Sequence, residues 1–234
     1  MKKLEKIYEG KAKIVYTTEN PEFVIQYFKD DATAFNAAKK GTVENKGIMN
    51  NKISSKIFEF LQSEGVSTHF EKQLSDREML IKRVEIVPIE VIIRNRAAGS
   101  LCRLLGLKEG LHLSHPILEF CYKRDDLGDP LINEYHIRGL NLATDQEMKT
   151  ISEYAFKVNE LMKKFFTRLN LELIDFKLEF GRYKGKIILA DEISPDTCRL
   201  WEIGTGKKLD KDRFRHDLGN VEEAYQDVMN RVVK

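Results

Sequence analysis

Strict alternation of apolar and polar residues marks the segment from Leu173 to Gly181. Positions 174, 176, 178 and 180 are all apolar, whereas the positions between them carry Asp175, Lys177 and Glu179. Successive side chains of a strand point to opposite faces, so this pattern predicts a strand with an apolar face on a core and a charged face in front of it.

A hairpin after this strand is expected to add another acid to the charged face. Residues Gly181 to Gly185 predict the connection, and Lys186 to Ala190 predict the return strand, which places Asp191 beside the charged residues at 175 to 179. Clustered carboxylates with a lysine are able to hold a divalent cation and a phosphate together. Antiparallel sheets also commonly carry alternating charge on a solvent face, so this segment alone leaves a site and a plain surface about equally supported.

Shorter patterns predict the remaining elements. Strands are expected at 6–9, 13–17, 23–29, 79–84 and 89–93, with Pro88 separating the last two because proline cannot donate to a sheet. Helices are expected at 48–63, 101–107, and from a capping box at Thr144 to Glu147; a last helix, ending near Val233, is expected to be capped by Asn220 with Glu223.

The interspersed strands and helices show no regular βαβ alternation, which predicts the α+β class. A boundary near residues 84–88 divides the chain into two predicted lobes, an N-terminal nucleotide lobe at 1–85 and a C-terminal lobe at 86–234 carrying the metal and substrate sites. A cleft between two lobes is a natural place for a ligand.

Overall charge excludes some classes of partner. The 234 residues include 39 basic and 37 acidic side chains, a formal net charge of +2, which gives no support to a nucleic-acid or membrane-surface protein. No apolar run is long enough to span a bilayer, and the start of the chain has no signal-like segment. The three cysteines form no CxxC motif, so we expect a cytoplasmic protein with reduced thiols.

Two segments carry groups suited to anions. Gly10 to Lys13 places two lysines on a tight turn, although a lysine-bearing hairpin tip is the more common explanation of such a turn. An apolar strand beginning at Ile89 runs into Arg94 and Ser100; arginine binds oxyanions in a bidentate manner, while Ser100 also suits a helix N-cap.

Weaker signals follow the return strand. Arg199 stands near the only tryptophan, where it either binds an anion or stacks on the ring. The charged run from Asp210 to Arg215 is interpreted by default as a solvated face. Together, two phosphate-handling segments, an Mg²⁺ pair and extra arginines suit an enzyme that uses ATP on a second anionic substrate.

Six segments resemble the SAICAR synthetase family, the phosphoribosylaminoimidazole-succinocarboxamide synthases. Residues 87–100 and 173–181 resemble its two signature segments, and the further matches occur in the family's order at 8–13, 125–130, 191–196 and 210–215. The resemblance covers nearly the whole chain and the length suits the short bacterial form.

The resemblance implies an ATP-dependent ligase of purine biosynthesis. Such an enzyme joins the 4-carboxylate of carboxyaminoimidazole ribonucleotide (CAIR) to the amine of L-aspartate and converts ATP to ADP and phosphate. It also implies Mg²⁺, a homodimer, and two α+β lobes with ATP between them, related to the ATP-grasp and protein-kinase arrangement.

Residue roles follow from the matched segments. The resemblance implies that the ATP phosphates are held by Lys11, Ala12 and Lys13. Adenine is expected at the backbone of Lys82, Val84 and Glu85. Magnesium is expected on Glu179 and Asp191, with Lys177 neutralising the transferring phosphoryl group. The CAIR phosphate is expected at Arg94, Ser100 and Arg199, and its ribose or imidazole at Asp175. Lys123 and Arg215 are the candidates for substrate carboxylates.

An acyl phosphate hydrolyses readily, so we expect a loop within residues 36–47 to close over the site. The resemblance has two local departures: Asn36 stands where some relatives carry Asp, and Arg124 where others carry Asn.

The alternative function is a small-molecule kinase using the same ATP site, which the absence of the HRDxxxxN and DFG motifs weakens. A non-catalytic binder of nucleotides or RNA is disfavoured by the near-neutral charge and the lack of an RNP-type aromatic pattern.

Overall fold

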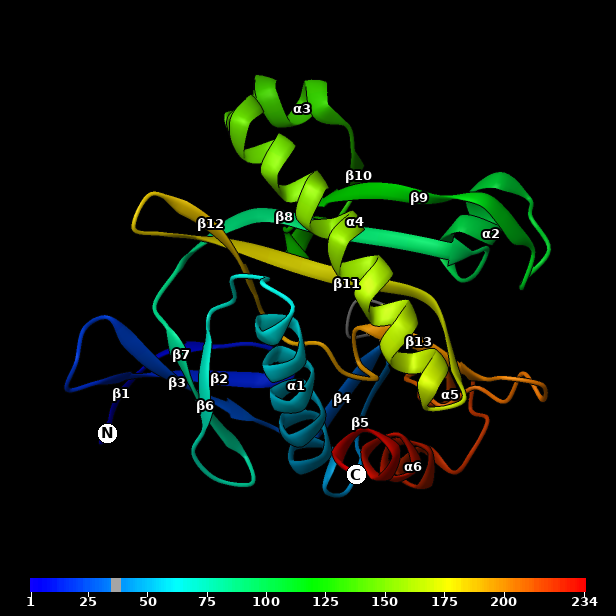
Figure 1. Cartoon of the computed structure of the whole chain (residues 1–234), viewed down its shortest axis with the longest axis horizontal. Helices are drawn as coiled ribbons and strands as arrows, with labels where there is room; N and C mark the ends of the chain where they lie inside the picture. The colour runs from blue at the N-terminus through cyan, green and yellow to red at the C-terminus, as the bar shows by residue number, and fades with distance from the viewer. Residues whose placement is uncertain (35–38) are drawn as a thin grey trace.

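Two antiparallel sheets form the framework of the computed structural model, which describes residues 1–34 and 39–234 (Figure 1). The first sheet has the strand order β1-β2-β3-β7-β6. Its strands are β1 (Lys3–Glu9), β2 (Lys13–Thr18), β3 (Phe23–Phe28), β7 (Glu78–Lys82) and β6 (Phe70–Gln73). A separate hairpin pairs β4 (Asp31–Ala34) with β5 (Lys39–Thr42).

The second sheet is built around a long central strand, β11 (Leu171–Tyr183). One edge of β11 pairs with β8 (Glu85–Arg96), and the other edge pairs first with β13 (Cys198–Glu202) and then with β12 (Lys186–Ala190). The strands β9 (His112–Tyr122) and β10 (Leu131–Ile132) extend the sheet beyond β8.

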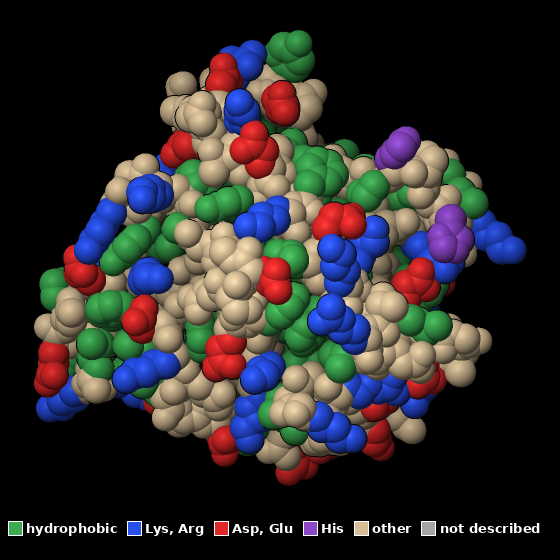
Figure 2. All heavy atoms as spheres, in the orientation of Figure 1, with side chains coloured by type: hydrophobic (Ala, Val, Ile, Leu, Met, Phe, Trp, Pro, Cys, Tyr) green, Lys and Arg blue, Asp and Glu red, His purple; other side chains and the backbone are tan. Residues whose placement is uncertain are grey.

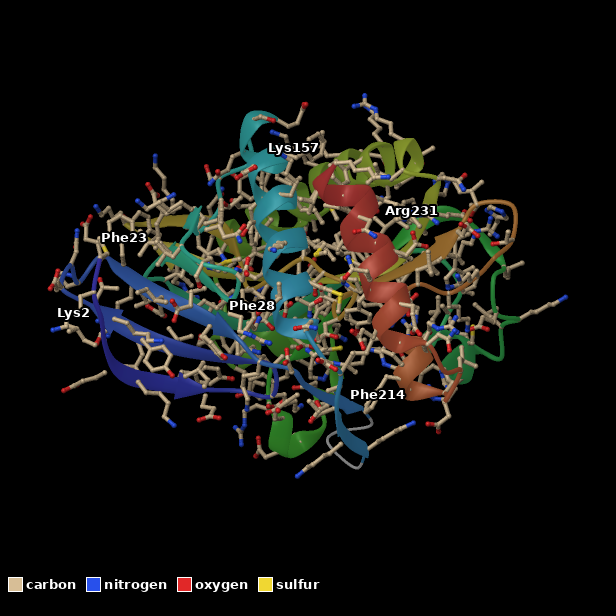
Figure 3. The ribbon with its side chains drawn as sticks, turned by 90° about the horizontal axis from the view of Figure 1, so that it is seen from below. Lys2, Phe23, Phe28, Lys157, Phe214 and Arg231 are labelled. Atoms are coloured by element: carbon tan, nitrogen blue, oxygen red, sulfur yellow. The ribbon has the colours of Figure 1, made fainter. Side chains whose placement is uncertain are left out.

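Helices cover and join the two sheets. Those longer than two turns are α1 (Lys46–Ser63), α4 (Asp145–Arg168) and α6 (Val221–Val233). The short ones are α2 (Ser100–Leu105), the 3₁₀ turn η1 (Asp125–Leu127), α3 (Glu134–Gly139) and α5 (Asp212–Arg215). In Figure 1, α4 crosses the second sheet, and Figure 3 shows α1 and α6 side by side, with Phe214 near the β4–β5 hairpin.

The sheets are joined where the chain passes from β7 to β8 and where β12 meets the segment before β6. There Thr68 pairs with Leu189 in a parallel bridge, and His69 N donates to Leu189 O at 2.8 Å. One apolar cluster runs from Phe28 and Ile53 to Phe176 and Leu189. The mixed helix-and-sheet class expected from the sequence is confirmed, and the two sheets share a continuous core.

The capping box at Thr144 shows how local sequence fixes the longest helix. The Thr144 side chain accepts from Glu147 N, and a Glu147 carboxylate oxygen accepts from Thr144 N at 2.8 Å. The helix then buries a stripe that includes Met148, Ile151 and Val158, as its 3.6-residue spacing predicts. None of the helices in the described ranges is both long and apolar enough to cross a membrane.

The expectation that Pro88 separates two strands is wrong. β8 runs through Pro88 without a break. Its pairing with β11 is irregular at this point: Glu90 lies opposite Glu179 and Ile86 lies opposite Gly181, and the register shifts between these two pairs. A proline at such an irregularity forfeits no ladder bond through its missing N–H. Its carbonyl still accepts from Lys123 N at 3.1 Å.

The predicted cap of α2 is wrong, because the helix begins at Ser100 and its N-cap is Gly99. The N-cap of α6 is Asn220 as predicted, but its side chain makes no capping hydrogen bond. The predicted hairpin turn is shorter than expected, because β11 continues to Tyr183 and only Lys184 and Gly185 form the turn, both with positive φ. The loop expected to close over the site includes residues 35–38, which lie outside the described ranges.

Candidate active site

A cavity of ≈ 770 Å³ is lined by residues from both sheets. Most of the predicted site residues line it: Lys11, Ala12, Lys13, Lys82, Val84, Lys123, Lys177, Glu179, Asp191 and Arg215. The side chains of Glu85, Arg94, Ser100, Asp175 and Arg199 are not part of this lining. Figure 2 shows basic and acidic side chains interspersed over one face of the molecule, in agreement with the balanced net charge.

Buried and half-buried charges of both signs meet on one wall of the cavity. Lys177 Nζ lies 3.2 Å from Asp191 Oδ2 and 3.1 Å from Glu90 Oε1, and it also pairs with Glu179. Lys13 pairs with Asp191 from the opposite sheet. Two carboxylates are therefore held together by lysines contributed by two different sheets.

The strand register explains this convergence. Glu179 on β11 lies opposite Ala190 on β12, so Asp191, the next residue, comes level with the charged face. Asp191 has φ 64°, a left-handed conformation that aspartate tolerates better than most residues. The prediction that Asp191 comes beside Lys177 and near Glu179 is confirmed, whereas Asp175 lies elsewhere on the strand.

The lysines keep this cluster ionised. Burial would raise the pKa of Asp191, but Lys13 and then Lys177 outweigh burial and hold that pKa well below its usual range. Burial would lower the pKa of Lys177, but Asp191 and Glu179 raise it well above the ordinary lysine value. Lys123, 3.0 Å from Glu179 Oε1, has a raised pKa for the same reasons.

Arginines and acids form a second cluster behind the cavity. Arg94 Nη1 lies 2.8 Å from Asp175 Oδ2, and Arg94 Nη2 donates to Ser100 Oγ at 2.8 Å. Arg199 reaches Asp175 at 2.8 Å and Asp212 at 2.8 Å. These contacts bring together the residues predicted for the CAIR phosphate, although none of them lines the cavity.

Arg215 connects this cluster to the cavity, because it lines the cavity and donates to Asp212 Oδ1 at 2.6 Å. Burial would lower the pKa of Arg199, but Asp175 and Asp212 raise it. Gly99 has φ 55°, and a Cβ there would lie 2.5 Å from Arg199 Nη2. The glycine is thus required both by the backbone turn and by the close approach of the guanidinium.

The predicted nucleotide residues divide into two groups. The Gly10–Lys13 turn is closed by Gly10 N donating to Lys13 O at 2.9 Å, and Lys11 on its tip pairs with Asp125 at 2.7 Å. Lys82 donates to Thr68 O at 3.1 Å on the cavity wall beside Val84. The Glu85 side chain instead pairs with Arg182 at 2.8 Å, away from the cavity.

The interpretation of residues 210–215 as a solvated charge cluster is wrong. Asp210 and Asp212 are 0% and 1% exposed, because Asp210 accepts from Leu200 N at 2.9 Å and Asp212 binds Arg199. Arg199 does not stack on Trp201; the cation over that ring is Lys208.

Sequence reasoning missed several cavity residues. Glu90 lies opposite Glu179, and an alternation count along β8 would have placed it on the charged face. Asp196 and Lys211 also line the cavity, and Asp196 is bound by the buried Lys46 at 2.6 Å. Nothing in the local pattern signals that ion pair, because its partners are 150 positions apart.

Comparisons with known proteins identify the family of this chain. The model of the SAICAR synthetase family matches residues 6–232. The chain belongs to the SAICAR synthetase family. Phosphoribosylaminoimidazole-succinocarboxamide synthases from Caldanaerobacter subterraneus and Clostridium novyi are 60% and 61% identical to it, over 99% and 97% of this chain and 99% and 96% of theirs.

Solved structures of the family share the fold. The Ehrlichia chaffeensis synthase superposes with a TM-score of 0.96 at 48% identity, covering 97% of this chain and 98% of its own. A SAICAR synthetase solved in complex with ADP gives 0.93 at 45% identity, with 96% of each chain covered. Family membership makes this chain an ATP-dependent ligase of purine biosynthesis.

Proposed function

We propose that the cavity is where this ligase joins the carboxylate of CAIR to the amine of L-aspartate at the expense of ATP. The observation that carries the proposal is the wall of buried and half-buried charges on which Lys13, Lys123 and Lys177 hold Glu179 and Asp191. Such a wall presents cations to phosphates and carboxylates to a metal, which phosphoryl transfer from ATP requires.

ATP binds between two lobes in this proposal, the first at residues 1–85 and the second at 86–234, in an arrangement related to ATP-grasp enzymes and protein kinases. In support, the cavity is lined from both sheets, and a relative was solved with ADP. Lys11, Ala12 and Lys13 contact the phosphates at the β1–β2 turn, while Lys82, Val84 and the backbone of Glu85 contact adenine at the crossing between the sheets.

The carboxylates fit a magnesium ion. Mg²⁺ is usually held by one or two carboxylates together with substrate phosphates, and Glu179 and Asp191 are such a pair. In the parts of the chain that the structure describes, no cluster of three or more His, Cys, Asp or Glu side chains suits a metal. An ion held by Glu179 and Asp191 would therefore need substrate phosphates and water as further ligands. The ion supplies charge neutralisation when bound, and Glu179 and Asp191 hold and orient it.

CAIR occupies the part of the cavity next to the arginine cluster. Arg94 and Arg199 offer the bidentate donors that a phosphate requires, and the Ser100 hydroxyl accepts from Arg94 in the same cluster. Asp175, which both arginines hold in place, is the acceptor for a ribose hydroxyl or the imidazole. Lys123 and Arg215 stand at the cavity wall for the substrate carboxylates.

A carboxylate is a poor electrophile, so the γ-phosphoryl group of ATP is transferred to the CAIR carboxylate first. The aspartate amine then attacks the acyl phosphate, and phosphate leaves. Lys177 lies against three carboxylates on the cavity wall, where its fixed charge compensates the transferring phosphoryl group. The protein's share of this chemistry is position and charge, with little covalent participation.

Magnesium-dependent nucleotide affinity tests the assignment. Titration calorimetry with ATP, with and without Mg²⁺, is compared for the wild-type protein, Glu179→Gln and Asp191→Asn. The two variants should lose the Mg²⁺-dependent gain in affinity. Glu172→Gln is the matched control, since Glu172 lies on the same strand but pairs with Arg96 away from the cavity. A full Mg²⁺ effect in both cavity variants would refute the metal assignment.

We propose a homodimer in the cytoplasm; the three cysteines are free thiols, as expected in a reducing compartment. Light scattering of the purified protein tests the dimer, and a monomer at micromolar concentration would contradict it.

A further inference from the structure

The lysines of the cavity differ in how well their charge is compensated. Lys13, Lys123 and Lys177 each have a carboxylate oxygen within 3.2 Å. Lys211 lines the same cavity, but its ion pair with Asp196 spans 3.8 Å. Its side chain is only 15% exposed, so water cannot fully replace a closer partner.

Asp196 has closer partners than Lys211. Lys46 Nζ lies 2.6 Å from Asp196 Oδ2, and the buried Tyr225 hydroxyl donates to Asp196 Oδ1 at 2.7 Å. Both carboxylate oxygens are therefore engaged by groups from α1 and α6. The negative charge that would normally stabilise a Lys211 ammonium is shared with another lysine.

The backbone holds Lys211 firmly in this position. Lys211 N donates to Pro195 O at 3.1 Å, and Arg215 N donates to Lys211 O at 2.9 Å. Lys211 and Arg215 thus start and finish the single turn of α5, and both side chains line the cavity. Arg215 and Lys211 therefore present a guanidinium and an amine to the same cavity, the two groups that the carboxylate and the α-amino group of an amino acid require.

The surroundings of Lys211 shift its protonation equilibrium toward the neutral amine. Burial lowers its pKa, and the positive charges of Lys46 on α1 and Arg215 on α5 act in the same direction. The acids that face it, Asp196 and Glu192 after β12, raise the pKa but do not compensate fully, so the pKa stays below the ordinary lysine value. The lysines at 13, 123 and 177 are shifted in the opposite direction.

The chemistry requires such a base. The α-amino group of aspartate is an ammonium ion at neutral pH and has no lone pair with which to attack an acyl phosphate. We propose that the Lys211 amine is the general base that takes a proton from the α-ammonium group of L-aspartate. This inference rests on the function proposed above and adds a role that the matched family segments did not assign.

Two protons leave the aspartate nitrogen as the amide bond forms. One proton passes from the aspartate ammonium to Lys211 Nζ, leaving a neutral amine and a lysine ammonium. The amine nitrogen forms a bond to the acyl carbon, the bond from that carbon to the phosphate oxygen breaks, and the second amine proton leaves with phosphate. Lys211 then returns its proton to solvent.

Variants of Lys211 distinguish a role as a base from a role as a positive charge, and a control variant detects a general loss of folding. Lys211→Met removes the base and the charge, whereas Lys211→Arg keeps a charge but supplies no base at accessible pH. Lys207→Met is the matched control, because Lys207 is exposed and does not line the cavity. Each protein is assayed for SAICAR formation between pH 6 and about 10, and for hydroxamate formation with hydroxylamine in place of aspartate.

Hydroxylamine is already unprotonated at neutral pH and needs no base. Both Lys211 variants should therefore form hydroxamate at the wild-type rate but lose about 100-fold or more in kcat for SAICAR at pH 7, with recovery as pH rises. Wild-type pH dependence in Lys211→Arg, or equal loss of hydroxamate and SAICAR, would overturn the inference. Absence of both products from the wild-type protein would instead refute the proposed function.

Discussion

The buried ion pair between Lys46 and Asp196 offers a sharp test of what holds the cavity wall in place. The side chains of Lys46 and Asp196 are 1% and 4% exposed, and their charged atoms lie 2.6 Å apart. Lys46→Met keeps most of the side-chain volume, so it removes the charge without opening a large cavity. The Asp196 carboxylate then stays buried with the Tyr225 hydroxyl at 2.7 Å and the Lys211 ammonium at 3.8 Å as its remaining partners.

The magnitude follows from burial. Breaking a buried pair by removing one partner costs about 3–5 kcal/mol, because an uncompensated charge remains in the interior. For a domain of this size, each kcal/mol shifts the melting temperature by about 2–4 °C. We therefore expect the melting temperature of Lys46→Met to fall by about 6–20 °C.

A lysine on the same helix provides the control. Lys52 pairs with Asp76 at 2.9 Å, but the two side chains are 32% and 65% exposed. Lys52→Met should cost at most about 1 kcal/mol. Urea denaturation followed by circular dichroism gives both free energies of unfolding. Equal losses of about 1 kcal/mol or less in the two variants would refute the reasoning that burial decides the strength of this pair.

Further predictions concern close approaches and a buried acid. In Gly99→Ala, the new Cβ would displace Arg199, so the KM for CAIR should rise at least about tenfold with the KM for ATP little changed in steady-state assays; unchanged KM values would contradict this role. In Gly181→Ala, the Cβ would lie 2.5 Å from Val84 Cγ2, and the free energy of unfolding should fall by about 1–3 kcal/mol in urea titrations; an unchanged midpoint would contradict it. Burial and then Asp212 raise the pKa of Asp210 to about 7. The folded state therefore binds more protons than the unfolded state between about pH 4 and 7, so stability should fall as pH rises through that window, and Asp210→Asn should flatten the fall; parallel curves for the two proteins would contradict it.

The sequence predicted the charged strand well because the signal there is local. Alternation from residue 174 to 180 determines which side chains face the core, and the short hairpin returns the chain so that Asp191 comes beside Lys177. The long helix after Thr144 was predictable for the same reason, since its cap and its apolar stripe lie within one segment.

The features that the sequence did not predict depend on pairing between segments far apart in the chain. The irregularity that accommodates Pro88 exists only because β11 pairs with β8 there. Residues 210–215 have the sequence pattern of a solvated charged run. In the structure, strand β13 places Leu200 N against Asp210 and the Arg199 guanidinium against Asp212. The special environment of Lys211 requires a lysine on α1 and a tyrosine on α6 to share one carboxylate, which no spacing along the chain records.

The most direct test of the central claim is phosphate release from Mg-ATP in an omission series, with CAIR alone, aspartate alone, both, or neither, while SAICAR is followed by its absorbance. We predict that product forms only with both substrates and matches the phosphate released one for one. Phosphate release that is independent of CAIR, or no product with both substrates present, would contradict the account.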